Sequence, residues 1–279
     1  MTSSGLVLRT GLAALIAVTC VRASAAEPSH ELARTGTTFM LTETGASLAL
    51  LVGATLFPVP KQCRWCDSNA FDRAGHDALL MSNPKSAAAV SHVFSFGVVP
   101  ATAIGAVSVA PLLRDQSSDA LANTAILLNV LMVDVALTAT AKFNVARRRP
   151  AFYYGRQADT EYASSTTEQN VSFFSGDTSV AFSLAAASST VAFLRGYEYA
   201  PYLAVGSGLA ASTVGVLRVS ANVHWPSDVL TGAFVGTAVG IGLPLLLHPR
   251  VHPADSSPAA GAGAPLRSAP PQLQLTMLW

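Results

Sequence analysis

Three short polar segments of the chain carry residues that could handle phosphate. The first, residues 142–150, reads Lys-Phe-Asn-Val-Ala-Arg-Arg-Arg-Pro and places Lys142 seven residues before Arg149. Arginine can grip two phosphate oxygens with its planar guanidinium, and lysine supplies a compact positive charge. Viewed alone, such a basic cluster beside an apolar run is more typical of membrane orientation or of contact with anionic lipid heads.

The second segment, residues 173–179, reads Phe-Phe-Ser-Gly-Asp-Thr-Ser and opens an apolar run. Backbone amides at the start of a helix bind anions, and glycine lets a ligand approach the backbone closely. Ser175 and Gly176 are therefore candidate phosphate-binding residues. The alternative is that Ser175 or Asp177 simply caps the helix.

The third segment contains Arg218, His224 and Asp228. Pro226 suits the first turn of a helix, so His224 is expected just outside the helix start and Asp228 inside the first turn. A hydrogen bond from one ring nitrogen to a carboxylate fixes the imidazole tautomer and leaves the other nitrogen free to attack. For this segment alone, a histidine and a helix cap at a membrane interface is an equally good interpretation.

Taken together and in order, the three segments resemble the phosphatidic acid phosphatase type 2 and vanadium haloperoxidase superfamily, whose signature is K-x6-R-P, then P-S-G-H, then S-R-x5-H-x3-D. Every spacing inside the motifs is kept. The matching residues are Lys142, Arg149, Pro150, Ser175, Gly176, Arg218, His224 and Asp228. Phe174 and Leu217 replace a proline and a serine that phosphate contact does not need, but Asp177 stands where the family has a histidine.

The resemblance implies a mechanism. His224 would attack phosphorus to form a phosphohistidine, Asp228 would orient its ring, and the three cations with the amides near Ser175 and Gly176 would hold the phosphoryl oxygens, with no metal and no cofactor. The family histidine at position 177 resembles a general acid, whereas an aspartate is mostly ionised at neutral pH. We therefore expect a slower phosphatase, or one that prefers leaving groups needing little protonation.

The composition indicates a membrane protein. Of the 279 residues 51% are hydrophobic and 12% are charged, whereas soluble domains carry roughly a quarter charged residues. The formal net charge of +1 gives no basic surface for a nucleic acid. The expected partners are instead the bilayer and a phosphorylated lipid or another phosphomonoester.

Six apolar runs are long enough to be membrane helices, since about 20 helical residues cross a bilayer. They lie at residues 37–57, 88–113, 119–141, 178–194, 199–216 and 228–247. The chain is therefore predicted to be an all-α, six-helix membrane bundle. The alternative is a water-soluble periplasmic protein with a buried helical core, because two of the runs are short. The polar connections 58–85, 142–177 and 217–227 all follow odd-numbered helices, which predicts that they share one face.

The domain division is predicted from these features and from the resemblance. Residues 1–26 resemble a signal peptide or an anchor helix; residues 27–85 hold the first helix and a cysteine-containing loop; residues 86–248 form the phosphatase core; residues 249–279 form a flexible tail rich in Pro, Ala, Gly and Ser. Cys63 and Cys66 are expected to be a disulfide or idle thiols rather than half of a zinc site.

The leading function is a lipid phosphate or pyrophosphate phosphatase in a bacterial-type inner membrane. A vanadate-dependent haloperoxidase and a catalytically idle phosphate- or lipid-binding membrane protein are the alternatives, the latter because of Asp177. The resemblance places the site on the periplasmic face, whereas a cleaved export signal followed by six spans would place it in the cytoplasm unless residues 37–57 do not cross. The loop 151–172 is expected to help choose the substrate.

Overall fold

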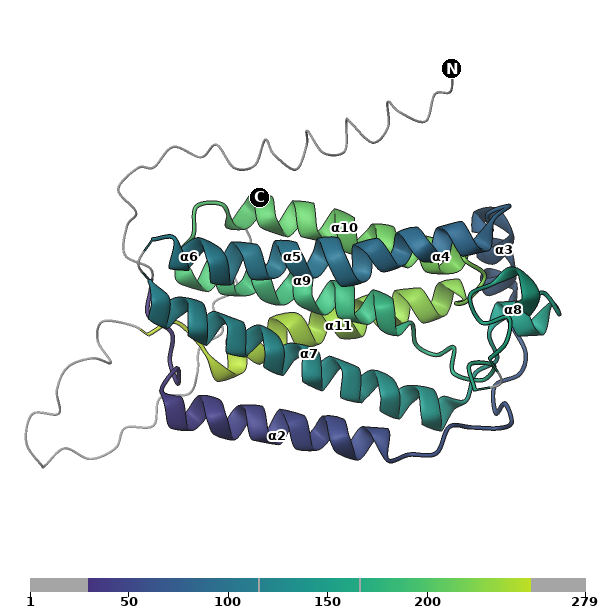
Figure 1. Ribbon diagram of the computed structural model, residues 1–279, viewed down its shortest axis with the longest axis horizontal. Coiled ribbons are helices and arrows are strands. Elements are labelled where there is room, and N and C mark those ends of the chain that lie inside the picture. The colour runs from purple at the N-terminus through teal and green to yellow at the C-terminus, as the bar shows by residue number, and fades with distance from the viewer. Residues whose placement is uncertain (1–29, 115, 166, 252–279) are drawn as a thin grey trace, which may run out of the picture.

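Six long helices run side by side in the computed structural model of the chain, which describes residues 30–114, 116–165 and 167–251 (Figure 1). All six predicted runs are confirmed, with ends displaced by four residues at most. They are α2 (Thr37–Thr55), the continuous rod Pro84–Leu112, α7 (Ser117–Val145), α9 (Gly176–Arg195), α10 (Ala200–Ser220) and α11 (Pro226–Leu247). Within the described residues the fold is all-α, as predicted.

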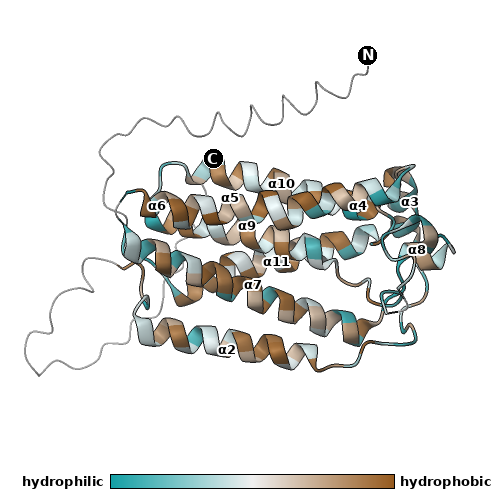
Figure 2. Cartoon of the chain, in the orientation of Figure 1, coloured by the Kyte–Doolittle hydropathy of each residue, from teal (hydrophilic) through white to brown (hydrophobic). Residues whose placement is uncertain are grey.

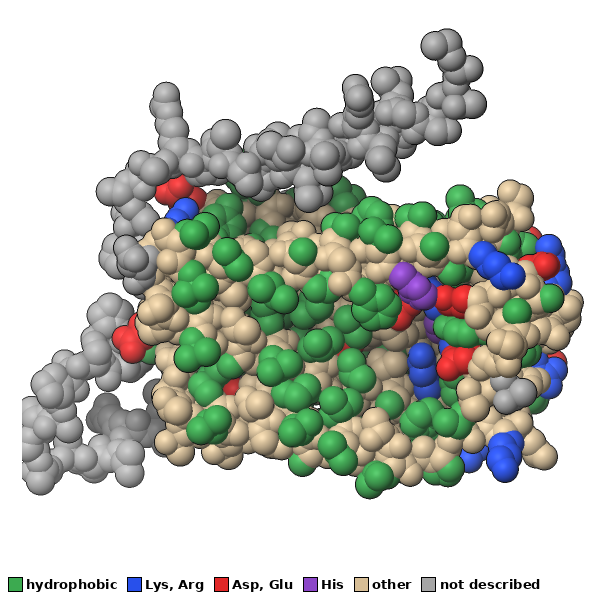
Figure 3. All heavy atoms as spheres, in the orientation of Figure 1, with side chains coloured by type: hydrophobic (Ala, Val, Ile, Leu, Met, Phe, Trp, Pro, Cys, Tyr) green, Lys and Arg blue, Asp and Glu red, His purple; other side chains and the backbone are tan. Residues whose placement is uncertain are grey.

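Each of these six helices is long and apolar enough to cross a membrane. Large apolar side chains on them point outward; Leu121 and Phe234 are each 75% exposed. Figure 2 shows apolar residues along the helices and polar residues toward their ends, and Figure 3 shows apolar side chains spread over the visible face. Soluble monomers rarely expose so much apolar surface, which favours the membrane class over the water-soluble alternative.

The rod Pro84–Leu112 begins at a proline and contains two more, Pro100 and Pro111, each of which follows a wider turn. It consists of α4 (Pro84–Val93), η2 (Phe94–Val98), α5 (Val99–Ile104), η3 (Gly105–Val109) and α6 (Ala110–Leu112), where η2 and η3 are π-helical. A proline cannot donate the usual helical hydrogen bond, and its ring clashes with the carbonyl four residues earlier. The π turns η2 and η3 end two residues before Pro100 and Pro111, so the rod continues without breaking.

Helix α9 is the centre of the bundle and packs against α7, α10 and α11. Gly232, Gly236 and Gly240 repeat every four residues along α11 and face backbone carbonyls of α9. A Cβ atom on Gly232 would lie 2.6 Å from the carbonyl oxygen of Ser175. The two backbones therefore touch without intervening side chains, a close approach that small residues allow between membrane helices.

The three polar connections meet at one end of the bundle, as predicted. They carry α3 (Ala70–Leu79), α8 (Pro150–Tyr153) and the short 3-10 helix η4 (Gln157–Asp159), and Figure 1 shows α3 and α8 together at that end. The amide of Ala151 donates to the carbonyl of Asn222 at 3.1 Å, and the amide of Arg64 donates to the carbonyl of Ala146 at 3.0 Å. All three connections are thus tied to one another.

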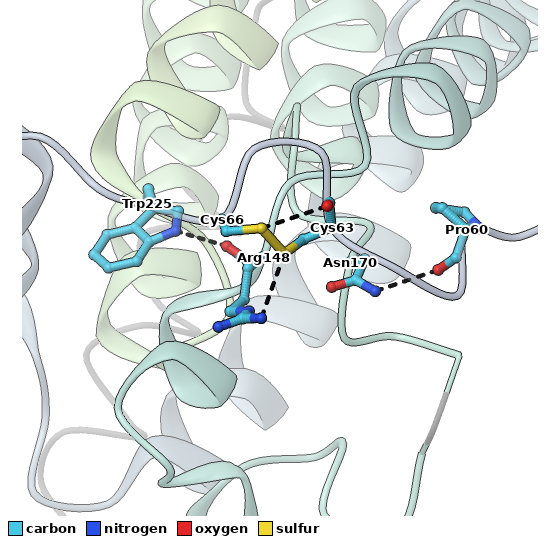
Figure 4. Close-up of a disulfide and its surroundings, with 6 residues drawn as sticks. All are labelled: Pro60, Cys63, Cys66, Arg148, Asn170 and Trp225. Atoms are coloured by element: carbon cyan, nitrogen blue, oxygen red, sulfur yellow. Dashed lines mark hydrogen bonds between the residues drawn. A yellow bond between two sulfur atoms is a disulfide. The ribbon is translucent and has the colours of Figure 1, made fainter.

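Cys63 and Cys66 form a disulfide, which is one of the two states expected for them. Figure 4 shows the bond beside Arg148, whose guanidinium donates to the sulfur of Cys63 at 3.3 Å. The carbonyl of the same arginine accepts a hydrogen bond from the indole of Trp225 at 2.9 Å. The disulfide loop is therefore fixed to the connection that follows α7 and to the start of α11.

The structure describes only part of the predicted domain division. The leader at residues 1–26 and nearly all of the tail at 249–279 lie outside the described residues. The expected boundary between residues 85 and 86 falls inside the first turn of α4, so the cysteine loop and the core are one continuous structure there.

Candidate active site

The predicted site residues gather at the end of the bundle where the connections meet. Lys142 lies in the last turn of α7, Arg218 in the last turn of α10, and Gly176 begins α9. The ammonium nitrogen of Lys142 lies 3.4 Å from the position that a Cβ atom on Gly176 would occupy. The missing side chain of Gly176 therefore leaves the room that brings this cation to the start of α9.

Arg149 precedes α8 and its guanidinium reaches the ring of His224. Its Nη1 lies 3.1 Å from Nε2 of His224 and donates to the carbonyl of Val223 at 2.9 Å, while its Nη2 donates to the carboxylate of Glu168 at 2.6 Å. The guanidinium also lies over the ring of Tyr162, 4.5 Å from its centre. Only 1% of Arg149 is exposed, so this cation is held rigidly beside the histidine.

Arg218 is the second buried cation and is surrounded by polar groups. Its Nε lies 3.1 Å from the carboxylate of Asp177, and its Nη2 donates to Glu161 at 2.9 Å. Its Nη1 lies 3.2 Å from Nε2 of His92. The His92 side chain is 43% exposed, so it contacts this buried arginine from the edge of the bundle.

His224 is buried, and one of its ring nitrogens is fixed by the backbone. Its Nδ1 lies 2.8 Å from the carbonyl oxygen of Ser172, and a carbonyl can only accept, so Nδ1 carries the proton and Nε2 has the lone pair, which accepts from Arg149. Burial lowers the pKa of His224 well below its usual value, and three neighbouring cations lower it further. The ring is therefore neutral at neutral pH, as a nitrogen nucleophile must be.

Asp228 was expected to hold the ring of His224 directly, and the structure corrects this. Its nearer carboxylate oxygen lies 3.7 Å from Nδ1 of His224, and instead accepts from the hydroxyl of Ser172 at 2.6 Å and from the amide of Trp225 at 2.9 Å. Its other oxygen accepts from Arg147 at 2.5 Å. Asp228 thus supports the histidine through Ser172, the residue whose carbonyl receives the ring proton.

The start of α9 offers backbone amides, although not that of Ser175 itself. The amide of Ser175 donates to the carbonyl of Asp228 at 3.1 Å, and its hydroxyl lies 2.8 Å from that of Thr178. The first hydrogen bond of the helix runs from Ser179 to the carbonyl of Ser175 at 3.0 Å. The amides of residues 176–178 precede that bond and point out of the helix, as anion-binding amides do.

A family model described as the PAP2 superfamily matches residues 123–251. The resemblance predicted from the three motifs is thus confirmed over this segment, which is a little under half of the chain. Among solved structures, the chain is similar to a transmembrane PAP2-type phosphatidylglycerolphosphate phosphatase from Bacillus subtilis, with 19% identity and a TM-score of 0.48, over 73% of this chain and 93% of that one. No curated protein matches the sequence.

The PAP2 segment contains every predicted site residue, but two groups that complete the site lie before it. His92 contacts Arg218, and Asp72 of α3 accepts from the buried Arg147 at 2.6 Å. Arg147 was not predicted as a site residue from the sequence. It lies in the basic run 142–150, at a position where the first motif specifies no residue type. The other missed groups are Glu161, Tyr162, Glu168 and Ser172, all of which lie in the connection between α7 and α9.

The site is therefore an enclosed cluster of cations around a neutral imidazole. In the described part of the chain, no group of three or more His, Cys, Asp or Glu side chains is arranged to hold a metal ion. Guanidinium, ammonium and amide donors that surround a buried nitrogen nucleophile suit a tetrahedral oxyanion.

Proposed function

We propose that the protein is a phosphatase that hydrolyses a phosphomonoester or pyrophosphate of a lipid through a phosphohistidine. One observation carries the proposal: the neutral ring of His224 presents Nε2 within 3.1 Å of the buried guanidinium of Arg149. A phosphoryl group held by that guanidinium would lie within reach of the nitrogen that attacks it. The match of residues 123–251 to the PAP2 superfamily supports the same reaction.

In the first half of the proposed reaction, Nε2 of His224 attacks phosphorus and the bond to the leaving oxygen breaks. The carbonyl of Ser172 retains the Nδ1 proton, so the ring keeps its orientation as positive charge develops. Arg149, Arg218 and Lys142 neutralise the three equatorial oxygens, on which charge is spread in the transition state. In the second half, water attacks phosphorus and His224 leaves.

A lipid substrate is favoured by the place of the site in the bundle. It lies at the end of six apolar helices, so a phosphorylated head group could enter while its chains stay in the bilayer. Apolar side chains border this end on the outside: Val93 is 60% exposed and Phe96 is 67% exposed. We propose phosphatidate, phosphatidylglycerol phosphate, a polyprenyl pyrophosphate or a lipid A phosphate as the substrates to compare.

We propose that the site faces the periplasm of a bacterial-type inner membrane. The Cys63–Cys66 disulfide lies in a connection at the same end as His224, and disulfides persist in oxidising compartments. If α2 crosses the membrane, a periplasmic site places residues 30–36 on the cytoplasmic face. Cleavage of an export signal near residue 26 would leave those residues on the periplasmic face, so the two are incompatible. Labelling of a cysteine introduced near residue 160 in intact cells measures the sidedness directly.

The proposal is tested by phosphate release from these lipids by the natural chain and its His224→Ala form. His248→Gln is a matched control, because His248 is also buried but pairs with Glu43 at 3.0 Å near the opposite end of α11. We expect turnover that only His224→Ala abolishes, together with an acid-labile phosphoenzyme. If the natural chain, His224→Ala and Asp177→His all release no phosphate, the proposed enzyme activity is refuted and a phosphate-binding protein is the remaining interpretation.

A further inference from the structure

The proposed reaction needs a proton donor for the leaving oxygen, and the residue at the expected position is poorly suited to that role. Asp177 lies 3.1 Å from Nε of Arg218, and such an ion pair favours the ionised carboxylate, which has no proton to give. Tyr162 is no better, because burial raises its pKa and makes it a weaker acid. The donor must therefore come from elsewhere.

A histidine from another helix faces this carboxylate. Nε2 of His92, in the last turn of α4, lies 3.9 Å from the carboxylate of Asp177 and 3.2 Å from that of Glu161. The same nitrogen lies 3.2 Å from Nη1 of Arg218. Within residues 30–114, 116–165 and 167–251, these three groups are the charged side chains in contact with the ring, and Phe96 packs against its edge with ring centres 5.6 Å apart.

The surroundings of His92 suit a nitrogen that exchanges a proton. Without a proton, Nε2 can accept from Arg218, whereas with a proton it can donate to Glu161, so each state has a partner at 3.2 Å. An imidazole is the side chain that changes protonation near neutral pH. Because the side chain is 43% exposed, it borders the outside of the bundle, toward which a leaving alcohol must depart.

We propose that His92 is the general acid and base of the reaction, in place of the histidine that the motif lacks at position 177. The proposal rests on the phosphatase function above. As Nε2 of His224 bonds to phosphorus, the bond to the leaving oxygen breaks and His92 gives that oxygen its proton, which releases an alcohol. Neutral His92 then takes a proton from the attacking water, the phosphorus–nitrogen bond breaks, and phosphate and both starting imidazoles are restored.

Asp177 then becomes a positioning residue. Its carboxylate lies 3.1 Å from Nε of Arg218 and 3.9 Å from Nε2 of His92, so it holds the arginine that contacts the ring. The exchange of histidine for aspartate at position 177 is thus compensated from α4. The acid remains next to the same arginine that is expected to hold the phosphoryl group.

The test compares two leaving groups in the full chain in detergent micelles. Nitrophenyl phosphate releases an anion that needs little protonation, whereas an alkyl phosphate lipid such as phosphatidate releases an alcohol that needs a proton. General acid catalysis contributes roughly 100- to 10,000-fold. We expect His92→Gln to lower kcat on phosphatidate by about 100-fold or more and kcat on nitrophenyl phosphate by less than about tenfold. Phe96→Ala, which alters the neighbouring ring, is expected to change the two rates in parallel.

Rescue provides an independent measurement. Adding Asp177→His to His92→Gln returns an imidazole to the same place and should restore much of the lost turnover of phosphatidate. Equal losses on the two substrates without rescue, or no loss on phosphatidate, would overturn the role of His92. If His224→Ala abolishes turnover while His92→Gln does not lower it, only this inference fails. If the natural chain is inactive on nitrophenyl phosphate and on all four lipids named above, the phosphatase function itself fails.

Discussion

Replacing Arg147 by methionine is expected to destabilise the protein more than any other single change on the basic segment. The guanidinium is fully buried and pairs with Asp72 at 2.6 Å and with Asp228 at 2.5 Å, and both carboxylates are also fully buried. Methionine fills similar volume but removes the cation between them. The two carboxylates would then lie in the interior without an opposite charge.

The size of the effect follows from that burial. Removing one partner of a buried ion pair costs about 3–5 kcal/mol, and here one cation serves two carboxylates. Part of the cost is offset, because Asp72 still accepts from the amide and hydroxyl of Ser227 at 2.9 Å, and Asp228 still accepts from Ser172. We expect a loss near 4 kcal/mol, or a fall in Tm of roughly 10 °C at about 2–4 °C per kcal/mol.

Thermal unfolding in detergent measures this loss, with Arg148→Met as the matched control. Among the described residues, Arg148 has no carboxylate within ion-pair distance, and its guanidinium contacts only the sulfur of Cys63. Its substitution should lower Tm by a few degrees at most. Adding Asp72→Asn to Arg147→Met should cost less than the sum of the single changes, by about 1 kcal/mol or more. Equal Tm values for the Arg147 and Arg148 variants would refute the reasoning.

Three further outcomes follow from contacts around the site. Glu168→Gln removes the charge of a partly exposed partner of Arg149. The inhibition constant for inorganic phosphate should fall by up to about fivefold, because exposed ion pairs contribute up to about 1 kcal/mol. Burial lowers the pKa of His224, so its neutral, attacking form persists in acid. We therefore expect kcat/KM to fall only at a pH below the usual pKa of a histidine. Arg149→Met should raise this pH, because Arg149 also lowers the pKa of His224. Gly232→Ala should destabilise the bundle by about 1–3 kcal/mol through overpacking against α9.

Each of these three predictions has a control variant or a result that would contradict it. Asp159→Asn removes a carboxylate of the same connection that pairs with the exposed Arg156, so phosphate inhibition should not change. An acidic limb at the pH of an ordinary histidine would contradict the burial of His224. Gly206 on α10 has open space where its Cβ would be, so Gly206→Ala should be neutral or stabilising.

The helices could be predicted because their signal is local. A run of apolar residues of membrane length needs no partner to be recognised, and all six runs became helices close to their predicted ends. The motif spacings likewise placed Lys142, Arg218 and His224 at helix ends, and helix ends on one side of a bundle meet. Direct contact between Arg149 and His224 follows from that arrangement.

The sequence could not show which of several neighbouring residues of the same chemical type takes which role in the site. Arg147 and Arg149 differ by two positions, yet one is enclosed by carboxylates and the other faces the histidine. Ser172 acts through its backbone carbonyl, which every residue possesses, so no residue type indicates it. His92 reaches the site from a helix outside the motifs, and only the packing of α4 against α10 brings the two together.

The charges in the site indicate how a substrate would bind. Arg149 and Arg218 are each 1% exposed, and a buried cation without a partner is unfavourable. Glu168 and Glu161, whose side chains are 33% and 18% exposed, supply the opposite charge from the connection between α7 and α9. A phosphate dianion would take over the same donors and release these carboxylates toward solvent. Binding would then be an exchange of anions, and its affinity would depend on how readily this connection moves away from the two arginines. We therefore expect residues 151–172 to influence substrate choice through that exchange.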